Sequence, residues 1–79
     1  MELDGRIATH RSALTPDEVR VAEFMAGNPH SVGHLSALKL VEVSRTSDAT
    51  VVRTVRKLGF EGLDELRENL ATELSRTGW

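Results

Sequence analysis

The sequence predicts an all-α fold, a compact bundle of five to six helices. Apolar residues recur at spacings of three and four along most of the chain, whereas the sustained period-two alternation of half-buried strands is missing. Capping and helix-breaking residues divide this pattern into short segments. The length of 79 residues suits one small domain, and residues 1–79 show no linker, repeat or low-complexity tract. We therefore expect a single domain.

The first part of the chain contains one weak and one strong helix signal. A weak helix is expected over residues 3–12, with Ile7 as its main apolar residue. The strong signal is the run T-P-D-E at residues 15–18, in which Thr15 caps a helix and Glu18 completes a capping box. Gly-Asn-Pro at residues 27–29 ends this helix, because proline disfavours helical geometry in the residue before it. The apolar face of the helix comprises Val19, Val21, Ala22, Phe24, Met25 and Ala26.

Two short helical segments follow this strong helix. Residues 30–35 suit a single helical turn, and Ser36 is a suitable cap for a short helix over residues 37–43. We expect Leu38 and Val41, together with Leu40, to face inward from this helix. Residues 44–46 then form a tight break.

Two further helices complete the predicted bundle. Ser47 is a cap and Asp48 an acid near the positive end of a helix over residues 47–58, which Gly59 closes. The last helix begins at residue 62 or 63 and extends to about residue 75. Its buried face is formed by Leu63, Leu66, Leu70 and Leu74.

Several classes of site and location are disfavoured by the composition. The chain has no cysteine, which excludes disulfides and thiolate metal sites. His30 and His34 have an i, i+4 spacing, but Gly33 weakens the helix between them and no third ligand is placed nearby, so no metal and no cofactor is expected. No apolar run approaches the roughly 20 residues that span a bilayer, and the first residues do not form a signal peptide. We expect a cytoplasmic protein without a membrane partner.

No arrangement of residues indicates an enzyme. Serine, histidine and aspartate are present, but no spacing assembles them into a nucleophilic site, and a glycine-rich phosphate loop is missing. The acidic residues of the last helix are interpreted as its solvated face. They are Asp64, Glu65, Glu68 and Glu73.

The distribution of charge is more informative than the net charge of −2. Residues 45–60 contain four basic side chains and only Asp48 as an acid, whereas both flanking regions carry more acids than bases. A local positive region on an acidic domain favours docking of a polyanion by that region. The pattern is equally typical of a solvated charged helix face. The basic residues are Arg45, Arg53, Arg56 and Lys57.

The helices over residues 36–43 and 47–58 form a predicted helix-turn-helix, in which the second helix enters DNA. Val51, Val55 and Leu58 share one face and would hold this second helix against the first. The helix is a rod about 16 Å long, which the major groove, about 12 Å wide, can admit. The other sides of the helix carry its arginines.

These residues resemble a known family. The similarity covers about residues 7–74 and rests on T-P-D-E at residues 15–18, S-D-A-T-V-V-R at residues 47–53 and R-K-L-G-F-E-G at residues 56–62. These segments resemble the N-terminal domain of the RpiR (MurR/RpiR) family of bacterial transcriptional regulators. The resemblance implies a homeodomain-like helix-turn-helix without a wing. It also implies a C-terminal sugar isomerase-type domain, absent from this chain, which binds a phosphosugar effector and dimerises.

The turn departs from the family pattern. Arg45 and Thr46 stand where the family usually has glycine and valine, and Val41 stands where alanine is frequent. Loss of the glycine makes a left-handed turn residue less certain. Arg45 adds a charge that can meet a phosphate, and we include Arg45 and Thr46 in the predicted DNA-binding set.

The remaining predicted DNA contacts lie in the second helix. Arg53 is suited to a bidentate pair with guanine or to a phosphate, or alternatively to a structural ion pair with an acidic neighbour. Ser47 is interpreted as a cap first and a phosphate ligand second, and Asp48 as an acceptor for cytosine or a dipole partner. Ala49 suits a thymine methyl and Thr50 a phosphate. Arg56 and Lys57 would add phosphate attraction or remain solvated surface.

The sequence therefore predicts the sequence-specific DNA-binding domain of a regulator of sugar or phosphosugar metabolism. Its partner is double-stranded DNA, and the parent protein is expected to bind as a homodimer to half-sites about 34 Å apart or a multiple of it. The alternative is a helical protein-interaction or dimerisation module without DNA binding, built on the leucines of the last helix.

Overall fold

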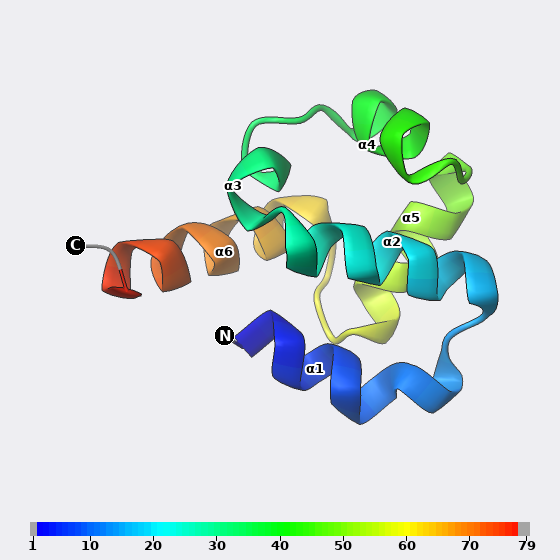
Figure 1. The fold of residues 1–79 in the computed structure, drawn as a ribbon, viewed down its shortest axis with the longest axis horizontal. Helices are drawn as coiled ribbons and strands as arrows, with labels where there is room; N and C mark the ends of the chain where they lie inside the picture. The colour runs from blue at the N-terminus through cyan, green and yellow to red at the C-terminus, as the bar shows by residue number, and fades with distance from the viewer. Residues whose placement is uncertain (1, 78–79) are drawn as a thin grey trace.

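Two helices packed against each other organise the fold: α2 (Pro16–Gly27) and α5 (Asp48–Lys57). The computed structural model describes the backbone of residues 2–77 and the side chains of residues 3–75. Figure 1 shows α1 (Glu2–His10) on one side of α2 and α4 (Ala37–Ser44) on the other. The short α3 (Pro29–Val32) and the long α6 (Leu63–Thr77) lie at the end where α2 finishes. A single 3-10 turn, η1 (Arg11–Ala13), links α1 to α2.

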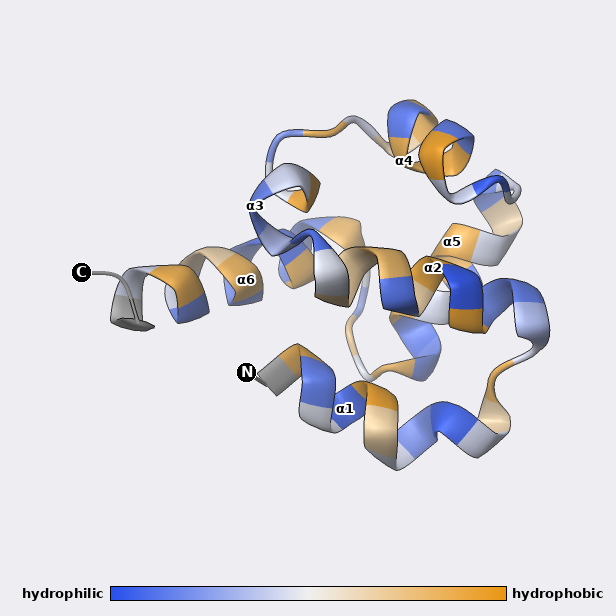
Figure 2. Cartoon of the chain, viewed as in Figure 1, coloured by the Kyte–Doolittle hydropathy of each residue, from blue (hydrophilic) through white to orange (hydrophobic). Residues whose placement is uncertain are grey.

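The all-α expectation is confirmed, because the described residues form six α-helices and one 3-10 turn. The Cα radius of gyration is 11.5 Å, close to the value of about 11.6 Å for a folded chain of this length. In Figure 2, hydrophobic and hydrophilic positions alternate along α2 and α6, as expected for amphipathic helices. Within residues 2–77, every helix is too short or too polar to cross a lipid bilayer.

One continuous core joins all six α-helices. Its fully or nearly fully buried apolar side chains are Leu3, Ile7, Val21, Ala22, Met25, Val32, Leu40, Val51, Val55, Leu58, Phe60, Leu66 and Leu70. The predicted inward faces of α2, α5 and α6 supply most of this list, and they are confirmed in outline. Leu63 and Leu74, at the two ends of the α6 face, are only half-buried.

The predicted inward face of α4 is wrong at one residue. Leu38 was expected inside but is 74% exposed, whereas Leu40 is fully buried. Leu40 and Ser44, four residues apart, share the inward side, and Leu38 lies about 200° around the helix from Leu40. Ser44 is accepted in the core because its hydroxyl donates to the Leu40 carbonyl at 2.7 Å. The segment after α2 also differs, since α3 spans Pro29–Val32 rather than residues 30–35.

The C-terminal end of α5 is connected to α1 through an arginine. Arg6 donates from Nη1 to the Leu58 carbonyl at 2.9 Å, and its guanidinium carbon lies 4.4 Å from the centre of the Phe60 ring. Gly59 has a φ of 96°, and a side chain here would meet Arg6 Nη1. The predicted glycine closure of α5 is therefore confirmed, and the close approach of Arg6 adds a second reason for it.

Candidate nucleic-acid interface

The turn between α4 and α5 is a Schellman motif whose left-handed residue is Arg45. The Thr46 backbone N–H donates to the Val41 carbonyl and the Arg45 N–H to the Glu42 carbonyl, both at 3.2 Å. Arg45 adopts φ 56° and ψ 45°, so the turn keeps a left-handed residue at the position where the family resemblance led us to expect glycine. Arg20 of α2 donates from Nη1 to the Arg45 carbonyl at 3.3 Å. The side chain of Arg20 therefore contacts the backbone of the turn.

Local hydrogen bonds set the start of α5. The Ser47 hydroxyl accepts from the Thr50 backbone N–H at 3.2 Å, which confirms the predicted cap. The Thr50 hydroxyl lies 2.9 Å from Ser47 Oγ, and the Thr46 hydroxyl lies 2.9 Å from Ser44 Oγ. Thr50 is only 5% exposed and Thr46 half-buried, so both hydroxyls serve the turn itself. Ser47, Asp48 and Ala49 are exposed.

The rest of α5 divides cleanly into a buried and an exposed half. Thr50, Val51, Thr54 and Val55 face the core, and the Thr54 hydroxyl donates to the Thr50 carbonyl at 2.7 Å. On the other half, Val52, Arg56, Ala49 and Arg53 follow one another within about 100° of the helix circumference. We call these four residues the outer face of α5.

Val52 on this outer face is 40% exposed, and sequence reasoning did not include it among the DNA contacts. Its exposure was predictable, because it lies outside the apolar stripe formed by Val51, Val55 and Leu58. Arg20 was also missed, and no sequence signal places it beside the turn, because 25 residues separate it from Arg45.

Glu18 of α2 is the buried centre of an ion cluster between α2 and α5. Its side chain is 1% exposed, and its Oε1 accepts from Lys57 Nζ at 2.7 Å and from the Thr15 backbone N–H at 2.8 Å. Its Oε2 accepts from Arg53 Nε at 3.3 Å. The ion-pair alternative left open for Arg53 is therefore present in the structure. Lys57 Nζ also donates to the Ala13 carbonyl at 3.0 Å. We call Glu18, Arg53 and Lys57 the α2–α5 ion cluster.

The ionisation of Glu18 is strongly favoured in this cluster. Burial alone raises the pKa of the Glu18 carboxyl. The hydrogen bonds from Lys57 and from the Thr15 backbone, the charge of Lys57 and the hydrogen bond from Arg53 outweigh burial and lower this pKa from 4.5 to about 2. The capping box predicted for Thr15 and Glu18 is confirmed, but the second role of Glu18 was not predicted.

The predicted DNA-binding residues thus occupy two different settings. Exposed positions near the turn and on the outer face are held by Arg45, Ser47, Asp48, Ala49, Arg53 and Arg56. Thr46, Thr50 and Lys57 are half-buried or buried and are engaged in the contacts described above. Arg53 belongs to both settings, because its side chain is 59% exposed although its Nε is paired with Glu18.

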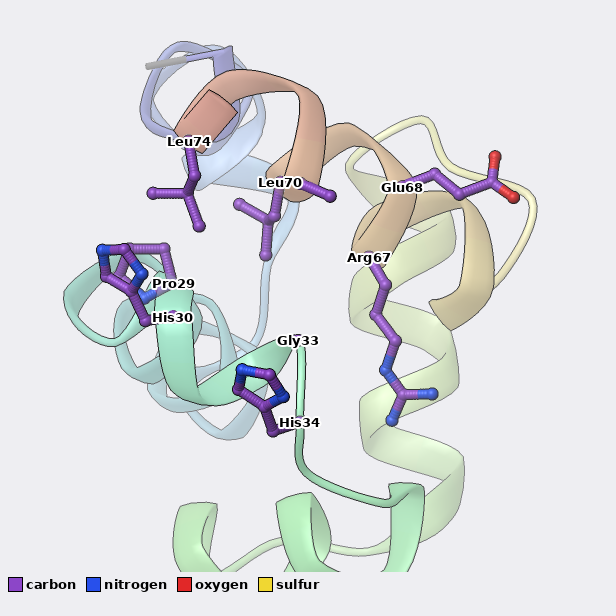
Figure 3. A pocket seen from close by; sticks show the side chains of 9 residues that line it. Pro29, His30, Gly33, His34, Arg67, Glu68, Leu70 and Leu74 are labelled. Atoms are coloured by element: carbon purple, nitrogen blue, oxygen red, sulfur yellow. The ribbon is translucent and has the colours of Figure 1, made fainter. Parts of the chain in front are cut away.

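His30 and His34 lie away from this region, in a hollow of about 370 Å³ between α3 and α6. Figure 3 shows Leu70 and Leu74 of α6 directed toward Pro29 and His30 across it. In the part of the chain that the structure describes, no group of three histidine, cysteine or acidic side chains is arranged to hold a metal ion.

Two short helices joined by a tight turn, with the second helix exposed along one half, define a helix-turn-helix domain. The family model for the helix-turn-helix domain of the rpiR family matches residues 1–77, and the chain belongs to this family. It is the DNA-binding type of domain found in transcriptional regulators.

Known relatives and solved structures agree with this assignment. The chain is 34% identical over 65 residues to the HTH-type transcriptional regulator TTE0211 of Caldanaerobacter subterraneus, covering 82% of this chain and 23% of that protein. It is 38% identical over 72 residues to the bifunctional protein glk of Burkholderia mallei, covering 91% of this chain and 11% of glk. The chain thus spans about a quarter or less of the length of these relatives.

Two solved structures share the fold. The Vibrio vulnificus NanR protein complexed with ManNAc-6P superposes with a TM-score of 0.86 at 32% identity, over 98% of this chain and 29% of that one. The N-terminal domain of the regulator YbbH from Bacillus subtilis gives a TM-score of 0.82 at 26% identity, over 94% of this chain and 89% of that one. The predicted family and the helix-turn-helix fold are confirmed.

Proposed function

We propose that this domain recognises a specific double-stranded DNA sequence by inserting residues 47–58 into the major groove. The observation that carries this proposal is the outer face of α5, which exposes two arginines and two small apolar side chains on a domain of net charge −2. Arginine pairs with the acceptor edge of guanine, and small apolar groups contact the thymine methyl. The outer face therefore has the chemistry to read bases.

Within this proposal the residues divide into base readers and phosphate ligands. Ala49, Val52, Arg53 and Arg56 face the bases, with Asp48 at the edge of the groove. Arg45 and Ser47 at the turn, joined by Arg20, face the phosphates, because they flank the positive end of α5. The hydroxyls of Thr46 and Thr50 and the ammonium of Lys57 act indirectly, by fixing the turn and the helix.

We further infer that the domain serves a cytoplasmic regulator of sugar or phosphosugar metabolism. Support comes from the NanR structure, which was solved with ManNAc-6P, a phosphorylated sugar, and matches this chain on only 29% of its length. The effector would accordingly act on a part of the regulator outside this domain, which itself carries out no reaction. A homodimer would place two copies of α5 on half-sites about 34 Å apart or a multiple of it.

The direct test is binding to a duplex selected from a random pool, compared with a scrambled duplex, by fluorescence anisotropy at several salt concentrations. Arg56 makes no side-chain hydrogen bond or ion pair within the described residues, so Arg56→Ala removes a DNA contact without breaking a structural one. A lost base contact lowers affinity for the selected duplex by about 1–3 kcal/mol, and a lost phosphate contact lowers the salt slope by about one.

Arg11→Ala is the charge-matched control, because Arg11 lies in η1, outside the α4–α5 unit, and pairs with Glu23 at 3.0 Å. We expect it to change affinity only slightly, since salt screens distant charges. Equal losses for Arg56→Ala and Arg11→Ala would contradict the assigned face. Concentration-dependent association without any response to DNA would support the interaction-module alternative instead.

A further inference from the structure

The guanidinium of Arg53 is bound to the protein through its Nε alone, within the described residues. Its Nε donates to Glu18 Oε2 at 3.3 Å, while 59% of the side chain remains exposed on the outer face of α5. A guanidinium has five N–H donors, and four of them are on Nη1 and Nη2. With Nε turned toward α2, the end formed by Nη1 and Nη2 is left for a second acceptor, in the fork geometry that matches guanine or phosphate.

Glu18 is itself fixed and cannot follow Arg53 outward. Its other oxygen accepts from Lys57 Nζ at 2.7 Å and from the Thr15 backbone N–H at 2.8 Å, and the side chain is 1% exposed. The carboxylate therefore belongs to the rigid seam between α2 and α5, which lie side by side in Figure 1. An arginine bound to such an anchor has lost much of its rotamer freedom before any ligand arrives.

Lys57, the second cation bound to Glu18, makes the net charge of the cluster positive. A single carboxylate opposite Arg53 would neutralise the charge that DNA is expected to attract. Lys57 restores it, so the α2–α5 ion cluster keeps a net charge of one positive unit while Arg53 is oriented. The cluster therefore still attracts phosphates while Arg53 is oriented, although by one charge less than it would without Glu18.

We propose that Glu18 is a positioning residue for DNA recognition: it preorients Arg53 so that the Nη1–Nη2 end meets its target with little further ordering. This inference rests on the proposed function. Immobilising one long side chain at an interface has a cost equivalent to about a 2- to 12-fold change in affinity. Nonspecific binding depends on charge and not on the orientation of Arg53. The preorientation should therefore raise the affinity for the specific duplex only.

The test is the ratio of affinities for the selected and the scrambled duplex in the variant Glu18→Gln. Glutamine keeps an oxygen for the Thr15 N–H but loses the charge that holds Arg53 and Lys57. We expect the ratio to fall by about 2- to 12-fold. The salt slope for the scrambled duplex should steepen by up to about one, since two cations are released. A purely structural role of Glu18 would instead lower both affinities in parallel with the folded fraction.

Asp17→Asn is the matched control. Asp17 is the exposed neighbour of Glu18 in the first turn of α2 and pairs with Arg20 at 3.8 Å. Its substitution removes the same charge without touching Arg53, and the release of Arg20, a proposed phosphate ligand, changes both affinities alike. We expect Asp17→Asn to leave the affinity ratio unchanged, and Glu18→Gln to have no further effect on the ratio in an Arg53→Ala background. Equal ratios for Glu18→Gln and Asp17→Asn would overturn the inference, as would an undiminished effect of Glu18→Gln in that background.

A second measurement needs no variant at Glu18. The Nε–H resonance of Arg53 in the wild-type domain should be shifted from that of free arginine, and it should persist when the selected duplex binds. Its return to the free-arginine position on binding would show that DNA breaks the pair, and would overturn the inference. If wild-type protein prefers no duplex, or Arg56→Ala leaves binding unchanged, the proposed function itself fails.

Discussion

The two ends of α5 are held in place by different kinds of interaction. At the start of the helix, the Ser47 cap and the left-handed turn at Arg45 use hydrogen bonds between residues only a few positions apart. At its other end, Arg53 and Lys57 are bound to Glu18, more than thirty residues earlier in the chain. The first end is held mainly by local hydrogen bonds, with one longer-range bond from Arg20 to the Arg45 carbonyl, whereas the second is anchored to α2 through Glu18.

This difference suggests a division of labour on DNA. The side chains of Arg45 and Ser47 are exposed, so they can meet the phosphates with small side-chain movements. The anchored half presents Arg53 in a fixed orientation, as recognition of a base edge requires. Substitutions at the two ends should therefore change the free energy of unfolding by different amounts and, in one case, in the opposite direction.

The largest expected effect on stability is at the anchored end. Glu18→Ala removes both the α2–α5 ion cluster and half of the capping box, and we expect a loss of roughly 3 kcal/mol in the free energy of unfolding. The measurement is urea denaturation followed by circular dichroism. Asp17→Asn, on the exposed side of the same turn, should cost much less. Similar losses for the two variants would mean that the cluster contributes nothing beyond surface charge.

Acid should weaken the same end selectively. The pKa of Glu18 is lowered in the folded state, so its stabilisation is complete above the unfolded pKa near 4.5 and is lost as pH falls through about 2. We expect wild type to lose up to about 3 kcal/mol more than Glu18→Gln over this window. Melting temperatures of both proteins between pH 7 and pH 2 measure the difference. Parallel curves would show that Glu18 has an ordinary pKa.

A smaller loss is expected at the capped end. Ser47→Ala removes the acceptor for the Thr50 N–H and should cost about 1 kcal/mol. Ser36→Ala, which removes the corresponding cap of α4, provides a comparison within the same unit. Urea denaturation should show a smaller loss of stability for both cap variants than for Glu18→Ala. A Ser47→Ala loss as large as that of Glu18→Ala would erase the distinction between the two ends.

The smallest effect should have the opposite sign. Arg45 occupies the left-handed region at φ 56°, which glycine adopts without steric cost. We expect Arg45→Gly to stabilise the domain by about 0.5–1 kcal/mol while weakening DNA binding through the lost charge, and Arg45→Ala to weaken binding without any gain in stability. Thermal melting and anisotropy on the same samples separate the two effects. Equal stability of the glycine and alanine variants would argue against a strained turn.

Features that depend on neighbouring residues were predictable from the sequence. The Thr15–Glu18 capping box, the Ser47 cap, the glycine closure at Gly59 and the buried valines of α5 each require only residues within a few positions. Local backbone geometry and helical periodicity determine them. For this reason the helix-turn-helix could be placed in the sequence to within one or two residues at its ends.

Features that depend on the packing of distant segments were not predictable. The capping-box role of Glu18 gave no sign that its carboxylate also binds Arg53 and Lys57. In α4, both Leu38 and Leu40 fit a helical pattern, and the positions of α2 and α5 decide that Leu40 is buried and Leu38 exposed. Sequence periodicity predicts that a helix has an apolar face, whereas tertiary contacts decide which of two candidate faces is buried.

The most direct test of DNA recognition by α5 is an NMR titration of the isotope-labelled domain with the selected duplex. The account predicts that the largest amide shifts fall on residues 45–49 and on Val52, Arg53 and Arg56, while the amides around the α3–α6 hollow stay nearly unchanged. Shifts centred on His30 and Leu74, with residues 45–56 unaffected, would contradict it.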